Sequence, residues 1–531
     1  MKQVMKSIKN FTVFVLSCMI VVVSFTACSK DDNVIDQPPT PPTSSGYPLS
    51  DITVTASGYI KAGVKSNLLT SGNAPSADDV TITHLTEDEA KAHASSTTGD
   101  AGKTFFLYRW TTLNYRCNTA DGTQKDLSEL VVWPYGIDDI TPTHLVVGCH
   151  STITSNNQCP SNFKNLSSLG EINILALFAA GVSQKALVVI PDYEGYGITA
   201  DIPHPYCNRE LTAEQVVTGV KAGLSYFEAN VSKMEDGWTG VAIGYSQGGA
   251  VAAGVLRYCQ EHSESALRLQ GAVCGDGPYD PLATLKRYIE MDKLYMPVAP
   301  AMLLKGVIDT DPDMKTIGCN YHDFVTDAFY NTGIFEMIAG KQKTTDDIQA
   351  ALLEHSLQYG DDGGFTMKAL CDDGYLPYTQ SNLTDGTGNQ RTFELENGKG
   401  YNFCTVDQCL KPEVIQYFRD GTISGDVPEA KLKALENALA KNALTAGNYK
   451  PGNGFTFFHS IGDEVVPFCN FESVRNTWGV GSIVALSYQS KTTLHVGTGT
   501  SFFLFYCGDL VDEILKGKWA PREDTVGGEI W

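Results

Sequence analysis

The amino-acid sequence predicts an α/β fold, in which helices flank a mostly parallel β-sheet and a helical insertion interrupts the succession of strands. The first observation is a regular alternation between residues 144 and 274. Short apolar runs typical of buried parallel strands are separated there by helical patterns. The second observation is that strand-like runs return at residues 455–458 and 482–486, after a long helical and loop-rich stretch. Because both flanks of that stretch continue the same pattern, we expect one sheet domain that carries an insertion.

The N-terminal segment is typical of a secretory signal. Three lysines precede an apolar run at residues 11–25, which is shorter than the roughly 20 apolar residues that span a membrane. Small residues follow and end at Cys28, an arrangement that resembles a bacterial lipoprotein signal. The resemblance implies that residues 1–27 are removed and that Cys28 becomes the acylated first residue. Residues 29–32 (Ser-Lys-Asp-Asp) are similar to an acidic tag that sends lipoproteins to the cell surface. We therefore expect an exported protein, anchored by lipid in the outer membrane; simple secretion is the alternative.

The composition restricts the partners of this protein. The 531 residues carry a formal net charge of −22, and removal of the three signal lysines takes it to −25. Such an acidic surface disfavours nucleic acid and anionic lipid headgroups, so we expect membrane contact through the lipid anchor only. Of the 14 cysteines, 12 lie beyond Cys28, and none of these shows paired C-x-x-C spacing. We expect no metal and no cofactor, and the spacing leaves disulfide pairing and the oligomeric state open.

The elements of the sheet domain follow a tether. Residues 28–46 are rich in proline and threonine, which is typical of an extended linker. A turn at residues 120–122 separates two strand-like runs and predicts a hairpin. Apolar residues at helical spacing from 216 to 227 predict a helix. The elements expected on such grounds are the hairpin strands 105–115 and 127–133, the strands 144–148, 186–190, 240–243, 271–274, 455–458 and 482–486, the helices 172–181 and 216–227, and a closing helix 502–516.

The long stretch between the two groups of predicted strands determines the domain organisation. Residues 281–450 combine helical patterns with a middle rich in glycine, aspartate and asparagine, and we interpret them as a cap inserted into the sheet domain. An independent third domain is the alternative. Within the cap, prolines interrupt an apolar run at residues 296–304, which predicts that the run is not one regular helix. The predicted boundaries are a signal peptide at 1–27, a tether at 28–46, the first part of the sheet domain at 47–280, the cap at 281–450 and the second part at 451–531.

Residues 238–254 contain the pattern on which the functional prediction depends. A strand at 240–243 runs into Gly-Tyr-Ser-Gln-Gly at 244–248, and a helix of small residues follows. In this strand–turn–helix context, G-x-S-x-G marks a nucleophile elbow, in which the glycines let two backbones approach and the turn lifts the serine oxygen above the sheet. We therefore predict that Ser246 is a nucleophile. A glycine-rich turn with an idle serine is the alternative.

A serine nucleophile needs a base, and the base needs a carboxylate that holds its tautomer. The strand at 455–458 runs into a loop that holds Asp463, and His495 comes 32 residues later, after one further strand. One intervening strand places these two loops side by side at one edge of the sheet, in the chain order Ser, Asp, His. Glu464 competes with Asp463, but its side chain should point the other way. His459 should pack or orient the loop.

The same chemistry needs two backbone donors for the developing oxyanion. The first donor is expected from Gln247, the residue after the nucleophile, and the second from the loop after an early strand, where Thr152 is the candidate. An ordinary loop residue is the alternative interpretation of Thr152. The segment 191–197 shows no chemistry of its own, and its carboxylates at Asp192 and Glu194 should satisfy buried backbone near the elbow.

Taken together, these motifs resemble those of the secretory lipase family of α/β-hydrolases, the lipase A type. Residues 244–249 resemble the family's G-Y-S-x-G-G elbow, residues 459–467 its H-x-x-x-D-x-x-V-P loop, and residues 191–195 its D-x-E-G segment. The likeness covers roughly residues 105–275 and 455–515. It implies the α/β-hydrolase fold with an inserted helical cap.

The sequence therefore predicts an exported serine hydrolase that cleaves carboxylic esters, a lipase or esterase, through an acyl-enzyme on Ser246. A small-molecule or lipid ester is the expected substrate. A serine peptidase of the same fold and a carbohydrate deacylase are alternatives, because a Ser-His-Asp triad does not choose between ester and amide. A surface binding protein without catalysis is the alternative from another class.

Overall fold

The structure is a computed structural model, and it describes residues 45–65, 80–95, 103–135, 141–165, 185–354, 404–489 and 495–527. Three sequence predictions lie outside these ranges: the signal peptide with Cys28, most of the tether, and the helix at 172–181. In the part of the chain that is described, no helix combines the length and the apolar character needed to cross a membrane.

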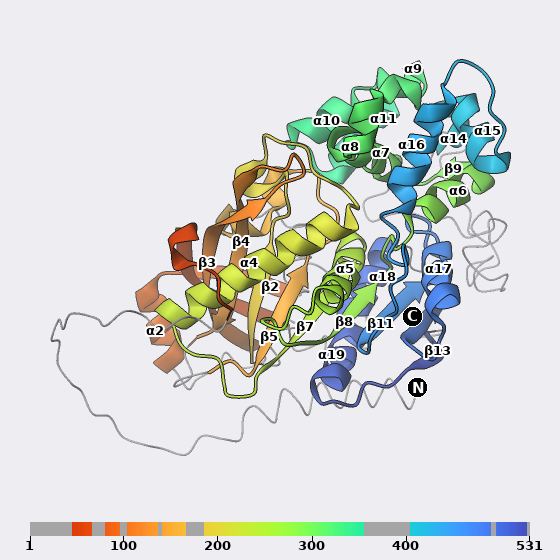
Figure 1. Cartoon of the computed structure of the whole chain (residues 1–531). Helices are drawn as coiled ribbons and strands as arrows, with labels where there is room; N and C mark the ends of the chain where they lie inside the picture. Colours follow the sequence, from red (N-terminus) through yellow and green to blue (C-terminus); the bar gives the residue numbers. More distant parts are fainter. Residues whose placement is uncertain are drawn as a thin grey trace, which may run out of the picture.

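One eleven-stranded sheet forms the centre of the molecule, in the order β13-β12-β11-β8-β7-β5-β6-β4-β3-β1-β2 (Figure 1). Neighbouring strands are parallel from β13 to β6, and β4, β3, β1 and β2 extend this sheet as antiparallel neighbours. The predicted hairpin is confirmed by the antiparallel pairing of β3 with β4. The strands are β1 Ile52–Lys65, β2 Val80–Leu85, β3 Lys103–Asn118, β4 Gln124–Pro134, β5 His144–Cys149, β6 Ala186–Pro191, β7 Thr239–Tyr245, β8 Leu269–Gly275, β11 Phe455–Ser460, β12 Val484–Gln489 and β13 Arg522–Gly527.

Helices cover both faces of this sheet, which explains why its central strands are apolar on both sides. In β6, Leu187 and Val189 pack on one face, and Val188 and Ile190 pack on the other. The predicted stripe on α4 is buried against the first face, together with α5 and α17. Figure 1 shows α4 and α5 lying across that face. The elements around the sheet are η1 Leu49–Asp51, α2 Glu87–Ser95, η4 Asn156–Gln158, η5 Pro160–Asn165, η6 Gly197–Thr199, α4 Arg209–Asn230, α5 Gln247–Glu261, α17 Cys469–Trp478, α18 His495–Ser501, a π-helix at Phe502–Cys507 and α19 Gly508–Leu515.

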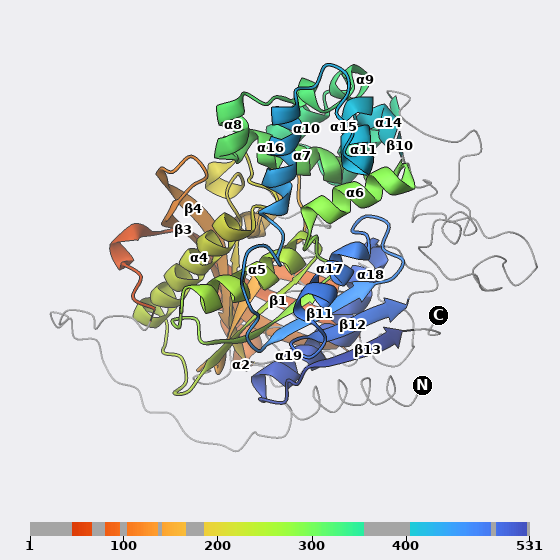
Figure 2. The ribbon, with the colours of Figure 1, turned by 45° about the vertical axis from the view of Figure 1, so that its right-hand side comes forward.

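Between β8 and β11 the chain forms a helical layer with its own hydrophobic core. Figures 1 and 2 show these helices gathered on one side of the sheet domain. They follow directly from the carboxyl end of β8, so the layer is attached at that edge of the sheet. Its elements are α6 Pro281–Met291, β9 Lys293–Leu294, α7 Val298–Thr310, α8 Pro312–Ile317, η7 Tyr321–Asp323, α9 Asp327–Tyr330, α10 Ile334–Gly340, α11 Thr345–Glu354, β10 Cys404–Thr405, α14 Val406–Cys409, α15 Pro412–Asp420 and α16 Glu429–Ala440.

One prediction inside this layer is wrong. Residues 298–304 of the apolar run at 296–304 lie in a regular helix, α7, in spite of the prolines. Pro297 caps the helix and Pro300 lies in its first turn, where the backbone N–H groups have no partner within the helix. A proline there removes no hydrogen bond, so the helix continues.

The C-terminal end also differs from the prediction. The region 502–516 is helical, but it consists of the π-helix at Phe502–Cys507 followed by α19. The chain then adds β13 at the edge of the sheet, which was not predicted. The side chains of β13 are mostly exposed and include Arg522, Glu523 and Asp524. An exposed edge strand with this composition lacks the apolar signal by which a strand is recognised in sequence.

Candidate active site

Ser246 lies on a sharp turn between β7 and α5. Its backbone angles are φ 58° and ψ −129°, a conformation that residues other than glycine rarely adopt. The glycines around it are required by close backbone contacts. A Cβ on Gly244 would lie 2.1 Å from the carbonyl oxygen of Gly248, and a Cβ on Gly248 would lie 2.0 Å from that of Cys149. The turn is therefore the predicted elbow, with the serine at the N-terminus of α5.

The structure brings together Ser246, His495 and Asp463, which are far apart in the sequence. The Oγ atom of Ser246 lies 2.9 Å from Nε2 of His495, and Nδ1 of His495 lies 2.5 Å from Oδ2 of Asp463. All three residues are buried, and Ser246 is 9% exposed. Because Nδ1 of His495 donates to the carboxylate, Nε2 is free to accept the serine proton. The arrangement is that of a nucleophile, a base and a carboxylate that orients the base.

Sheet topology explains why these side chains meet. The strands β7, β8, β11 and β12 are neighbours, and parallel strands end at the same edge of a sheet. Ser246 follows β7, Asp463 follows β11, and His495 follows β12 after a short stretch outside the described residues. The predicted pairing of the Asp463 loop with the His495 loop is confirmed by the parallel register of β11 with β12.

Burial and hydrogen bonding act in opposite directions on Asp463. Burial dominates and raises the pKa of this carboxyl to about 7. The N–H groups of Val466 and Val465, which donate to Oδ1 (2.7 and 2.9 Å), and a hydrogen bond with Asp276 oppose this rise. Burial also lowers the pKa of His495, so its imidazole is neutral in the resting protein. A neutral imidazole is the form that can act as a general base.

Glu464 and Tyr245, which both contact the backbone of His495, are placed differently from what the sequence predicts. Glu464 does not point away from the site: its Oε2 accepts the backbone N–H of His495 at 2.9 Å. Tyr245 was not predicted as a site residue, yet its hydroxyl lies 2.6 Å from the carbonyl oxygen of His495. Neither role has a sequence motif, because each contact joins residues that are far apart along the chain.

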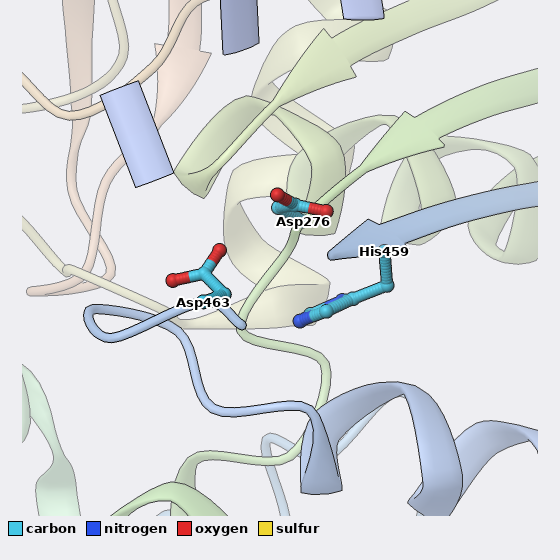
Figure 3. Close-up of side chains that lie close together, drawn as sticks. All are labelled: Asp276, His459 and Asp463. Carbon is cyan, nitrogen blue, oxygen red and sulfur yellow. The ribbon is translucent and has the colours of Figure 1, made fainter. Parts of the chain in front are cut away.

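His459 has the predicted role of orienting the loop. Its Nε2–H donates to the carbonyl oxygen of Val466 at 2.9 Å and so supports the turn that presents Asp463. Figure 3 shows His459 beside Asp463 and Asp276. One ligand atom from each of these three residues lies within 4.8 Å of the others, although no metal site was expected from the sequence. Both oxygens of Asp463 already accept N–H groups, so the donor set does not favour a cation there.

The two candidate oxyanion donors lie near the elbow. Gln247 begins α5, and its side-chain Nε2 lies 2.8 Å from Nε2 of His204, whose Nδ1 donates to a backbone carbonyl. The loop after β5 lies against the elbow, since a Cβ on Gly248 would also lie 2.8 Å from the carbonyl oxygen of His150. Thr152 is two residues further on, with its hydroxyl 3.0 Å from that of Tyr206. Its role as an oxyanion donor stays a prediction.

The carboxylates of the segment 191–197 are buried and accept backbone N–H groups. Asp192 accepts the backbone N–H of Ser161 at 2.7 Å, and Glu194 accepts that of Ala120. The carbonyl oxygen of Glu194 accepts Nδ1–H of His204, which connects this segment to Gln247. The segment is thus linked through His204 to Gln247, the residue that follows Ser246 in the elbow.

Comparison with known proteins adds evidence on the fold. No protein-family model matches the sequence, and no curated protein matches it. Among solved structures, the rice cell wall degrading esterase LipA from Xanthomonas oryzae is similar, with a TM-score of 0.56 and 14% identity over 88% of this chain and 99% of that one. A protein from Legionella pneumophila that is named a putative hydrolase is also similar, with a TM-score of 0.55 and 16% identity over 78% of this chain and 91% of that one.

Candida antarctica lipase A has a TM-score of 0.49 and 13% identity over 79% of this chain and 81% of that one. Three observations agree on the architecture: the order of strands in the sheet, the elbow between β7 and α5, and the likeness to LipA. The chain has the α/β-hydrolase fold, with a serine, a histidine and an aspartate hydrogen-bonded in series at the carboxyl edge of its sheet.

Proposed function

We propose that this chain is a serine hydrolase that cleaves carboxylic esters, a lipase or esterase of the secretory lipase type. The observation that carries the proposal is the hydrogen-bonded series Ser246, His495, Asp463 on a strained elbow. The motifs at 244–249 and 459–467, which resemble that family, support the ester class. A small-molecule or lipid ester is the substrate, and the chemistry needs no metal and no cofactor.

Acylation begins when Oγ of Ser246 attacks the ester carbonyl carbon. Nε2 of His495 takes the serine proton as the new C–O bond forms, and Asp463 stabilises the imidazolium. The backbone N–H of Gln247, at the N-terminus of α5, donates to the oxyanion, with Thr152 as the second donor. Collapse of the tetrahedral intermediate expels the alcohol, which leaves with the proton from His495.

Deacylation repeats these steps with water. His495 removes a proton from a water molecule that attacks the acyl carbon, and the proton is returned to Oγ of Ser246 as the acid leaves. The elbow holds Ser246 in one orientation for both halves of the reaction, because its backbone has little freedom between Gly244 and Gly248.

A substrate panel tests the proposal directly. The purified protein should react with a fluorophosphonate probe at Ser246 and release p-nitrophenol from acyl esters, but should not release anilide from peptide anilides. Preference for anilides would support the serine peptidase instead. Turnover restricted to acetylated polysaccharide would support the carbohydrate deacylase. A chain that reacts with neither probe nor ester would be a binding protein.

The proposal extends to the place where the enzyme acts. Residues 1–32 support export through a lipoprotein signal and a lipid on Cys28, which holds the enzyme at the outer membrane and directs it towards the cell surface. The net charge of −25 after removal of the signal supports a role in which neither nucleic acid nor an anionic membrane surface is a partner.

A further inference from the structure

Asp276 is a buried carboxyl beside the triad that the proposed mechanism does not use. It follows β8, the strand between the elbow strand β7 and the Asp463 strand β11. Its side chain is fully buried, and Figure 3 shows it near Asp463. The backbone N–H of Ser460 donates to Oδ1 at 2.8 Å, and the hydroxyl of Tyr245 lies 2.6 Å from Oδ2.

The contacts of Tyr245 determine where a proton must lie. Its hydroxyl oxygen is 2.6 Å from Oδ2 of Asp276 and also 2.6 Å from the carbonyl oxygen of His495. A carbonyl oxygen can only accept, and a phenol has one hydrogen to donate. Two such short contacts are both hydrogen bonds only when Oδ2 of Asp276 carries a proton and donates it to the phenol oxygen.

We propose that Asp276 acts as a neutral carboxylic acid and a positioning residue, which donates to Tyr245 so that Tyr245 donates to the carbonyl oxygen of His495. This chain of hydrogen bonds holds the backbone carbonyl of His495, the catalytic base, in place. It also leaves Asp463 as the anionic carboxylate that faces the imidazole. The inference rests on the proposed function, because it assigns a role in the same reaction.

The surroundings of Asp276 favour this protonation state. Burial is the largest cause that raises its pKa, to about 7, and the negative charge of Asp463 acts in the same direction. The contact with Tyr245, and any positive charge on His459 or His495, act in the opposite direction. Two carboxyls in one buried site cannot both be ionised at low cost. Of the two, Asp463 accepts more N–H groups and is therefore the anion.

The other groups that face this pair bring no proton to it. His459 donates its Nε2–H to Val466, and within the described residues its buried Nδ1 has no hydrogen-bond partner. Burial lowers the pKa of His459, so the ring is neutral and Nδ1 carries no hydrogen. Burial keeps the pKa of Tyr245 far above its usual range, and Glu464 is engaged with the backbone of His495.

Two matched substitutions separate a neutral acid from an anion. Asp276→Asn keeps the shape, the donor to Tyr245 and the acceptor for Ser460, so kcat should stay within about threefold of wild type. Asp463→Asn should lower kcat by about 10⁴, because an amide cannot stabilise the imidazolium or hold its tautomer. If Asp276→Asn is as inactive as Asp463→Asn, Asp276 is needed as an anion and the proposal is overturned.

Removal of the hydrogen-bond donor to Tyr245 should lower the activity, in contrast to Asp276→Asn. Asp276→Leu should lower kcat by about 10² with little change in KM, since a displaced base slows the reaction without touching substrate. Tyr245→Phe breaks the same chain at its next link and needs no change at Asp276, so it also tests the proposal if Asp276→Leu does not fold. The double variant should be no slower than the worse single variant. Additive losses would show that the two residues act separately.

The pH profile supplies a readout that a purely structural role would not change. In the wild type, kcat should fall as pH rises through the ionisation of Asp276, because the Tyr245 proton then turns towards the new carboxylate and leaves His495. Asp276→Asn should lack this alkaline decline. Activity that disappears with a chelator and returns with Zn²⁺ would place a cation instead of a proton here and overturn the proposal. Probe labelling of Ser246 tests the proposed function independently of each result.

Discussion

Ser246 combines a strained backbone with a hydrogen bond to His495. Its positive φ places the residue where strain of about 1–3 kcal/mol is stored, and the surrounding close contacts hold it there. Such strain is retained in native proteins when it places a reactive group. The conformation therefore belongs to the site and makes Ser246 the first residue to test.

Ser246→Ala should abolish ester turnover without unfolding the chain, because it deletes only the nucleophilic hydroxyl. We expect the rate to fall to about 10⁻³ or less of wild type, with an unchanged melting temperature. His495→Ala should have the same effect on turnover. Ser473→Ala is the matched control, since its hydroxyl bonds Asp280 outside the triad. A Ser246→Ala protein that retains substantial turnover would contradict the mechanism.

His495 makes the activity depend on pH in a defined direction. Burial lowers its pKa below the ordinary value near 6.5. The base must be neutral, so kcat/KM should rise as pH increases through this lowered pKa, with the midpoint of the rise below about pH 6.5. The measurement is a pH–rate profile on p-nitrophenyl esters, with aliquots returned to neutral pH to exclude unfolding. An acidic limb centred above pH 7 would mean that burial does not govern His495.

At the scale of elements, helix α5 approaches the sheet more closely than side chains permit. A Cβ on Gly249 would lie 2.2 Å from the carbonyl oxygen of Gly275 on β8, whereas one on Gly254 would meet its nearest atom, on Arg209, at 3.4 Å. A side chain would therefore clash with the backbone at Gly249, whereas there is room for a methyl group at Gly254. Only the first is required by packing.

Gly249→Ala should destabilise the protein by about 1–3 kcal/mol, because the new methyl group forces α5 away from β8. Gly254→Ala, in the same helix, should be neutral or stabilise it by up to about 1 kcal/mol through better helix propensity. Urea unfolding of both variants measures the difference. Equal stability of the two would show that α5 can shift at no cost.

Cys404 and Cys409 lie at the two ends of the short segment β10–α14. Both are buried, and their Sγ atoms are 3.1 Å apart. In an oxidising compartment we expect each thiol to lose its hydrogen to a disulfide-forming oxidant and the pair to be joined. Cleavage before Asp407 separates the two cysteines in sequence, so the fragments should remain linked until reduction. Mass spectrometry would contradict the pairing if either cysteine is joined to another one.

At the scale of the whole molecule, the sheet domain and the helical layer have separate hydrophobic cores. The sheet clusters lie on its two faces, and a third cluster holds the helices between β8 and β11 together. The apolar residues of α7 belong to that third cluster. Ser246, Asp463 and His495 instead follow strands of the sheet. The relative positions of these three side chains therefore depend on the sheet domain.

Anchoring is predicted to depend on residues that precede this folded part. Cys28→Ser should move the protein from the membrane fraction to the soluble fraction and leave its specific activity unchanged. One acyl chain holds a protein only marginally, while several hold it firmly, and we expect the Pro-rich tether to separate the lipid from the folded part. Fractionation and an ester assay on both fractions provide the measurement. Retention of the variant in the membrane would indicate another anchor.

The amino-acid sequence by itself determined the elbow, the order of Ser246, Asp463 and His495, and the sheet on which they lie. These features are encoded locally, because glycine spacing, apolar strands and turn residues act over a few consecutive positions. The tertiary structure alone decided the contacts of Tyr245, Asp276 and Glu464 and the presence of β13. The contact between Tyr245 and His495 joins residues 250 positions apart, and no local pattern specifies such a contact. Strand neighbours bring these residues together, and burial then sets their protonation.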